Sequence, residues 1–140
     1  FGENPYSFYV LENLIAIANA LVFLFINLRL LFRDQSVNTY RIVGAVNVYL
    51  LLALIGALTL EVIHAATGAS IGGNVVLKGA DGDYVHFIYF SLTSLTTVGF
   101  GDIYAVNAPA KMLATFLSAL GILFPAIVIA RLVGLASSRS

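Results

Sequence analysis

Cysteine is absent from this 140-residue sequence, and charged residues are scarce at 10%. Without cysteine, the chain can form neither a disulfide bond nor a thiolate metal site. The scarcity of charge argues against a soluble domain, in which roughly 25% of residues are charged. Hydrophobic residues instead make up 60% of the chain, and its mean hydropathy is +0.97. This balance predicts a protein that resides in a lipid bilayer.

The sequence also lacks the spacings that chemistry at a catalytic site requires. It contains no metal-ligand spacing, no nucleophile–base pair and no phosphate-binding loop. We therefore expect no enzymatic activity, and we expect neither a nucleic acid nor a small-molecule substrate as a partner.

Three apolar segments are long enough to cross a bilayer, which takes about 20 residues. They run from about Tyr9 to Phe32, from Ile42 to Ile63 and from Met112 to Val133. The alternative, a soluble core, would place three wholly apolar helices inside a chain too small to cover them. The sequence therefore predicts an all-α membrane protein that spans the bilayer three times.

The charges indicate how these segments are oriented. Arginines gather at the first turn and at the far end of the third segment, whereas acidic residues gather in the connection between the second and third segments. The arginines are Arg29, Arg33, Arg41, Arg131 and Arg139, and the acids of the connection are Glu61, Asp81, Asp83 and Asp102. By the positive-inside rule, the first turn and the C-terminus are cytoplasmic and the acidic connection is extracellular.

Two short segments flank the first span. The turn after it holds Asp34, Ser36 and Asn38, which are good helix-capping residues for the second span. The topology places the N-terminus outside, and the chain opens with Phe1 instead of Met. We expect a longer protein, with a processed N-terminus as the alternative.

Residues 96 to 102 read Thr-Thr-Val-Gly-Phe-Gly-Asp. Gly99 and Gly101 can adopt left-handed backbone angles that other residues avoid. With Val98 and Phe100 between them, the backbone can alternate in handedness so that successive carbonyl oxygens face one side. Four such strands around an axis would replace the hydration shell of a potassium ion. Because the motif occurs once, the four strands must come from four chains, which predicts a homotetramer.

A short helical segment precedes this motif. It runs from Tyr84 to about Leu95, with Asp83 as its expected N-cap. Twelve residues make about 18 Å of helix, too short for a hydrocarbon core of about 30 Å. We expect the segment to dip into the bilayer and return; a surface amphipathic helix would leave the glycine motif unexplained. The glycine-rich stretch from Ala65 to Gly82 reads as an exposed extracellular loop.

These features resemble the pore domain of tetrameric potassium channels, over about Arg41 to Val133. The resemblance implies an outer helix, a re-entrant pore helix with its filter, and an inner helix, preceded here by one extra transmembrane helix. It divides the chain into residues 1–39, the extra helix and turn, and 40–140, the pore domain. More weakly, the chain resembles the C-terminal part of small bacterial six-helix channels, whose fourth helix would correspond to the first helix here.

The same resemblance implies roles for individual residues. The K⁺ sites would be formed by the carbonyls of Thr97, Val98, Gly99 and Phe100, together with the Thr97 hydroxyl. Gly101, Asp102, Thr93 and Thr96 would support the filter. Phe100 replaces the commoner tyrosine, and Thr93 stands where some members carry a glutamate that pairs with the filter aspartate. We expect a weaker bond from the Thr93 hydroxyl to Asp102.

Gly121 falls on the hinge glycine of the family's inner helix, and Pro125 follows four residues later. Pro125 has no N–H to donate to the Gly121 carbonyl, and its ring clashes with that carbonyl. A bend between them would open the cytoplasmic mouth of the pore. A fixed kink without a gating role is the alternative.

The sequence therefore predicts the pore-forming subunit of a potassium-selective channel, a multi-pass protein of a prokaryotic plasma membrane, with K⁺ as the conducted ion. The alternatives are a non-selective cation channel of the same architecture and a subunit of a potassium uptake transporter. Transporters of that kind typically carry four filter-like loops in one chain, which this sequence does not.

Overall fold

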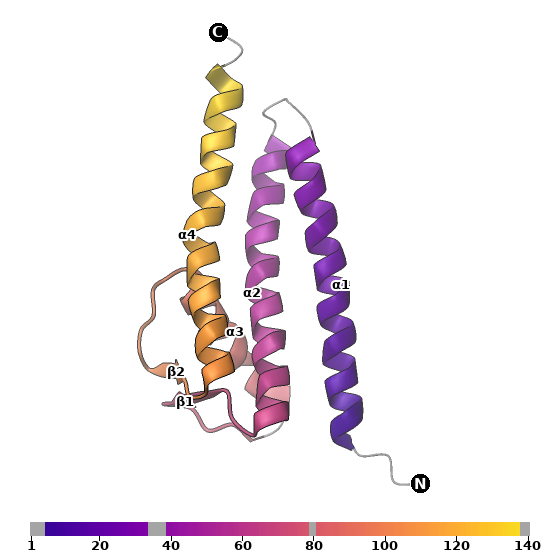
Figure 1. Ribbon diagram of the computed structural model, residues 1–140, viewed down its shortest axis with the longest axis vertical. Helices are drawn as coiled ribbons and strands as arrows, with labels where there is room; N and C mark the ends of the chain where they lie inside the picture. The colour runs from indigo at the N-terminus through magenta and orange to yellow at the C-terminus, as the bar shows by residue number, and fades with distance from the viewer. Residues whose placement is uncertain (1–4, 34–38, 79–80, 138–140) are drawn as a thin grey trace.

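The computed structural model describes residues 5–33, 39–78 and 81–137. Three long helices dominate these residues: α1 (Pro5–Arg33), α2 (Thr39–Thr67) and α4 (Ala108–Ser137). They lie side by side, with α2 between the other two and running in the opposite direction (Figure 1).

All three long helices are apolar and long enough to cross a membrane, over Phe8–Arg33, Tyr40–Thr67 and Ala108–Gly134. The three predicted spans are thereby confirmed, each slightly longer than the sequence indicated. Large apolar side chains on the outer faces are exposed in the single chain, with Phe23 at 62% and Phe25 at 66%. Lipid tails solvate such side chains, whereas water does not.

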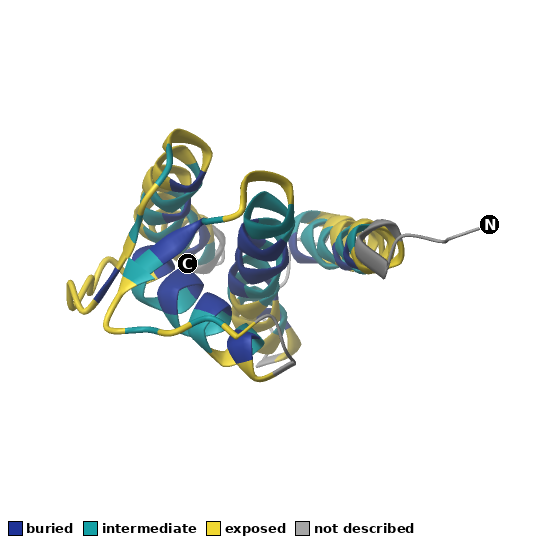
Figure 2. Cartoon of the chain, turned by 90° about the horizontal axis from the view of Figure 1, so that it is seen from below, coloured by how far each residue is buried: buried dark blue, intermediate teal, exposed yellow. Residues whose placement is uncertain are grey.

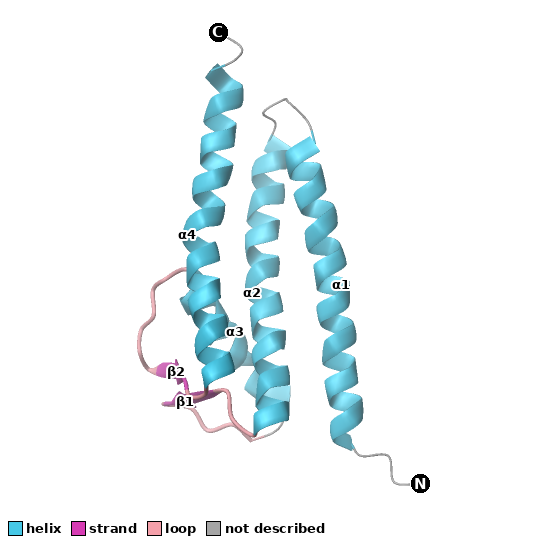
Figure 3. Ribbon diagram, viewed as in Figure 1, coloured by secondary structure: helices cyan, strands magenta, loops and turns pink. Residues whose placement is uncertain are grey.

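The remaining elements gather at one end of the long helices (Figure 3). They are β1 (Ile71–Gly73), a 3₁₀ turn (Asp81–Asp83), α3 (Tyr84–Leu95) and β2 (Ile103–Ala105). Helix α3 has the bounds that the sequence predicted. The two strands pair antiparallel, with Ile71 opposite Ala105 and Gly73 opposite Ile103.

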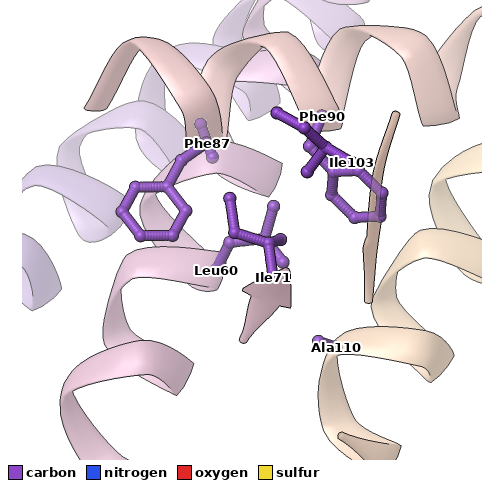
Figure 4. Close-up of a cluster of buried hydrophobic side chains, with 7 residues drawn as sticks. Leu60, Ile71, Phe87, Phe90, Ile103 and Ala110 are labelled. Carbon is purple, nitrogen blue, oxygen red and sulfur yellow. The ribbon is translucent and has the colours of Figure 1, made fainter. Parts of the chain in front are cut away.

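A buried hydrophobic cluster joins these short elements to the long helices (Figure 4). Phe87 and Phe90 of α3 contribute its largest side chains, and full burial of one such ring is worth about 1.5–3 kcal/mol. The other members are Ala57 and Leu60 of α2, Ile71 of β1, Ile103 of β2 and Ala110 of α4. Figure 2 shows burial concentrated where these elements meet, while α1 is largely exposed. The buried cluster therefore lies in the part of the chain that follows α1.

Helix α1 is attached to α2 and α4 by polar contacts at three levels. Near its start, the Tyr9 hydroxyl donates to the buried Glu61 carboxylate. Further along, the Asn47 amide donates to the Asn27 side-chain oxygen at 3.1 Å. At its end, the Arg131 guanidinium donates to the Phe32 carbonyl at 2.6 Å and lies 4.8 Å from the centroid of the Phe32 ring.

The expectation of an exposed loop from Ala65 to Gly82 is wrong for its first half. Helix α2 continues to Thr67, Ser70 is fully buried and Ile71 is 5% exposed. The reason is tertiary: Ile71 enters the core and the strand that holds it pairs with β2.

Capping also differs from expectation. Asp83 precedes α3 but itself has helical angles, and its side chain caps no helix N–H. Its carboxylate instead accepts the backbone N–H of Lys78 at 3.0 Å. The predicted capping residues of the turn, 34–38, lie outside the described residues.

Candidate functional site

The heptapeptide from Thr96 to Asp102 leaves the end of α3 as an irregular strand. Gly99 has a φ of 48° and Gly101 a φ of 80°, the left-handed angles predicted for both glycines. Thr97 also has a positive φ, 58°, whereas Val98 and Phe100 do not. The handedness of the backbone therefore alternates over five consecutive residues.

The left-handed angle of Thr97 is a finding that the sequence did not predict. A positive φ is a genuine outlier for a β-branched residue and costs about 1–3 kcal/mol, which the surrounding structure must offset. Two hydrogen bonds hold this part of the strand against α3. The N–H of Thr97 donates to the Ser94 carbonyl at 3.1 Å, and the N–H of Gly99 donates to the Thr93 carbonyl at 3.2 Å.

The strand lies on an open side of the single chain. Val98 is 53% exposed and Phe100 is 70% exposed. Beside the strand is an open hollow of about 410 Å³ between α3 and α4. Its polar lining includes Thr93, Ser94, Thr97, Lys111, Thr115 and Ser118.

Asp102, the last residue of the heptapeptide, is held by Tyr89 of α3. The Tyr89 hydroxyl donates to the Asp102 carboxylate at 2.9 Å. The Tyr89 ring also stacks on Phe100, with centroids 6.4 Å apart and an angle of 11° between the planes. Burial and the Asp102 carboxylate raise the pKa of the Tyr89 phenol. The phenol therefore keeps its proton and remains a hydrogen-bond donor.

The expected bond from Thr93 to Asp102 is wrong. The Thr93 hydroxyl instead donates to the Phe90 carbonyl at 3.1 Å, within its own helix. Tyr89 lies one turn before Thr93 on the same face of α3, and its longer side chain reaches the carboxylate. That spacing of four residues is the signal by which the sequence alone would have revealed Tyr89.

The C-terminal end of α3 is fixed by both neighbouring long helices. The Ser118 hydroxyl of α4 donates to the Ser94 carbonyl at 2.9 Å, and the Tyr49 hydroxyl of α2 donates to the Leu95 carbonyl at 3.2 Å. Gly121 of α4 lies so close to the Leu95 carbonyl that a Cβ there would overlap its oxygen. These carbonyls form the negative end of the α3 dipole, which favours a cation nearby.

Pro125 lies inside α4, which is helical without interruption from Ala108 to Ser137. The predicted hinge between Gly121 and Pro125 stays a prediction. The structure adds a packing reason for the glycine, its contact with Leu95.

A family model described as "Ion channel" matches residues 48–137. The match takes in most of α2, both strands, α3 and all of α4. The chain belongs to the ion channel family. This ion channel is an all-α membrane protein with a potassium-channel-like pore, and α1 lies outside the matched residues. No curated protein and no solved structure matches the chain.

The charged side chains of this ion channel offer no conventional cation site in the part of the chain that the structure describes. No three His, Asp or Glu residues there are placed to hold a metal ion.

Proposed function

We propose that this ion channel is the pore-forming subunit of a potassium-selective channel. One observation carries the proposal: left-handed residues alternate with ordinary ones at Thr97, Gly99 and Gly101, directly after a helix too short to span the bilayer. Such alternation turns successive carbonyls toward the same side. A ring of these carbonyls replaces the water around K⁺, the conducted ion.

The K⁺ sites in this proposal are the carbonyls of Thr97, Val98, Gly99 and Phe100, with the Thr97 hydroxyl at the inner end. Gly101 and Asp102 form the exit of the filter. Thr93 and Thr96 support it through contacts between α3 and the residues that follow it: the Thr93 carbonyl accepts the Gly99 N–H, and the Thr96 hydroxyl donates to the Leu92 carbonyl at 2.7 Å.

The subunits are proposed to assemble as a homotetramer, because one chain supplies only one edge of the ring. Two features of the single chain support this. The side chains Val98 and Phe100 are exposed, and the open hollow beside them is lined in part by the hydroxyls of Thr93, Thr97 and Ser118. A neighbouring copy would cover both. Mass measurement in mild detergent should give four chains; a conducting monomer or dimer would contradict the proposal.

The orientation follows from the arginines. Arg29, Arg33, Arg41 and Arg131 lie toward the ends of the long helices that are opposite to α3 and the strands (Figure 1). By the positive-inside rule, that end faces the cytoplasm and the filter exit faces outward. We propose a prokaryotic plasma membrane as the location.

The decisive experiment is a reversal-potential measurement on the purified protein in planar bilayers, with K⁺ on one side and Na⁺ on the other. A potassium-selective channel gives a reversal potential far from zero, on the side set by K⁺. A non-selective cation channel gives a value near zero. Absence of current in the purified protein would favour a transporter or a regulatory subunit that needs other chains.

A further inference from the structure

The outer end of the filter is held by a segment that comes from the glycine-rich connection. Residues 70–74, which we call the outer brace, lie alongside the residues that follow the filter. Their backbone pairs through β1 and β2, and the N–H of Val106 donates to the Ser70 carbonyl at 3.0 Å. The N–H of Asn74 donates to the carbonyl of Asp102 at 2.8 Å. The last residue of the filter is thus bonded by its main chain to the brace and by its side chain to Tyr89.

Gly73 makes this approach possible. Its φ is 112°, a left-handed angle that favours glycine. A Cβ at this position would overlap the Asp102 carbonyl oxygen and would lie 3.2 Å from the Tyr104 ring. Both the angle and the space therefore require glycine, and the lack of space is set mainly by the backbone of Asp102.

The brace is itself fixed to the buried cluster and to the long helices, so it can restrain the position of Asp102. Ser70 is fully buried and Ile71 is a member of the buried cluster with Phe87 and Phe90. The residues just before the brace are held by Asn107, whose side-chain amide donates to the Thr67 hydroxyl at 2.8 Å and to the Ala69 carbonyl. The oxygen of the same Asn107 side chain accepts the N–H of Ala110 at 2.9 Å, at the start of α4. One amide thus joins the end of α2 to the beginning of α4.

We propose that the outer brace positions the filter, with Gly73 and the Asn74 N–H as the positioning groups. The inference rests on the proposed function. Carbonyl dipoles that all face one axis repel each other, and bound cations offset that repulsion. When external K⁺ is low and the sites are emptier, the protein alone must keep the strand in shape. The bond from Asn74 to Asp102 supplies this constraint at the outer end.

The main test compares two substitutions at Asn74. Asn74→Pro removes the N–H that donates to Asp102, whereas Asn74→Ala removes the side chain and keeps that N–H. We expect Asn74→Pro to lower the K⁺/Na⁺ permeability ratio about tenfold at low external K⁺, and we expect the ratio to recover at high external K⁺. A tenfold change corresponds to the loss of one interaction. Asn74→Ala should behave as the parent. Equal selectivity of the proline variant and the parent at every K⁺ concentration would overturn the inference.

A second pair tests the close approach at Gly73. Gly73→Ala should show the same K⁺-dependent loss, and the exchange of the Asn74 amide hydrogen with solvent should become faster. Gly68→Ala is the matched control, because Gly68 also has a left-handed φ, 79°, but a Cβ there meets nothing within 4 Å. If Gly68→Ala loses selectivity to the same extent, strain in the connection is responsible and the positioning role is refuted.

The proposed function and the brace fail in different ways. If the parent protein does not prefer K⁺ over Na⁺, both the proposed function and the positioning role of the brace are refuted. If the parent is potassium-selective and its Asn74→Pro and Gly73→Ala variants are equally selective, only the positioning role of the brace is refuted. If Gly73→Ala does not assemble, the two Asn74 variants still decide, because neither adds an atom at residue 73.

Discussion

Gly121 of the last helix lies directly against the carbonyl oxygen of Leu95, the residue that ends α3. The same oxygen accepts a hydrogen bond from Tyr49 at 3.2 Å. Three helices therefore meet at the point where the proposed filter begins. The glycine is required there for close packing, in addition to any flexibility that it gives to α4.

Gly121→Ala is expected to force α4 away from α3, because the added methyl group overlaps the Leu95 oxygen. Overpacking of this kind costs about 1–3 kcal/mol. We expect reduced thermal stability of the detergent-solubilised protein and altered K⁺/Na⁺ selectivity, since the filter starts at the displaced residue. Gly134→Ala is the control: it lies on the same helix, and a Cβ there meets nothing within 4 Å. Equal effects of both substitutions would refute the packing role.

Pro125→Ala tests the bend without adding an atom at Gly121. It restores an N–H that can bond to the Gly121 carbonyl, and so stiffens α4. In the proposed tetramer, four subunits that move in concert would multiply the change, so open probability should fall strongly while selectivity stays unchanged. Single-channel recordings measure both. An open probability equal to that of the parent means that the kink is fixed and that gating lies elsewhere.

Gly99→Ala is expected to abolish potassium current or its selectivity. Gly99 has a φ of 48°, and a Cβ there meets nothing within 4 Å, so backbone strain alone would distort the strand. The strain is about 1–2 kcal/mol in each chain and would act in all four strands of the proposed tetramer. Gly44→Ala in α2, which also meets nothing within 4 Å and has no left-handed angle, should leave reversal potentials unchanged. Unaltered selectivity in Gly99→Ala would remove the filter assignment.

Tyr89 predicts an alkaline transition. The pKa of its phenol is raised above 10.0, so the bond to Asp102 is fully present below that pH and is lost as pH rises through the raised value. Selectivity should be constant from neutral pH to about 10 and decline above it. Tyr89→Phe keeps the ring that stacks on Phe100 and removes the hydroxyl. Its selectivity should be lower at neutral pH and should show no alkaline decline; an unchanged decline would exclude Tyr89 as its source.

Tyr9→Phe should weaken the attachment of α1. The substitution removes the hydroxyl that donates to Glu61 and leaves a buried carboxylate with one partner fewer. Loss of such a partner costs about 1–3 kcal/mol. Thermal unfolding in detergent should show the loss, and Tyr40→Phe, at a residue that is 83% exposed, should change stability by less than about 0.5 kcal/mol. A Tyr9→Phe variant as stable as the parent would show that apolar packing alone holds α1.

The sequence by itself determined the spans, the bounds of α3 and the left-handed positions of the two glycines of the heptapeptide. Each of these depends on local properties: the length of an apolar run, the helical pattern between Asp83 and Thr96, and the absence of a Cβ. Such properties are fixed by neighbours in the chain, and a pattern of residues reveals them.

Only the tertiary structure decided which groups hold the heptapeptide. Tyr89 bonds to Asp102 in place of Thr93, and Asn74 reaches the same residue from a connection that reads as an exposed loop. The contact between Gly121 and Leu95 is likewise invisible in a pattern that shows only a glycine inside a helix. Some of these contacts join residues that are distant in the chain. In others, two residues such as Tyr89 and Thr93 are alternative donors to one acceptor. Their outcome depends on side-chain reach and on the packing of several elements at once, which no local pattern encodes.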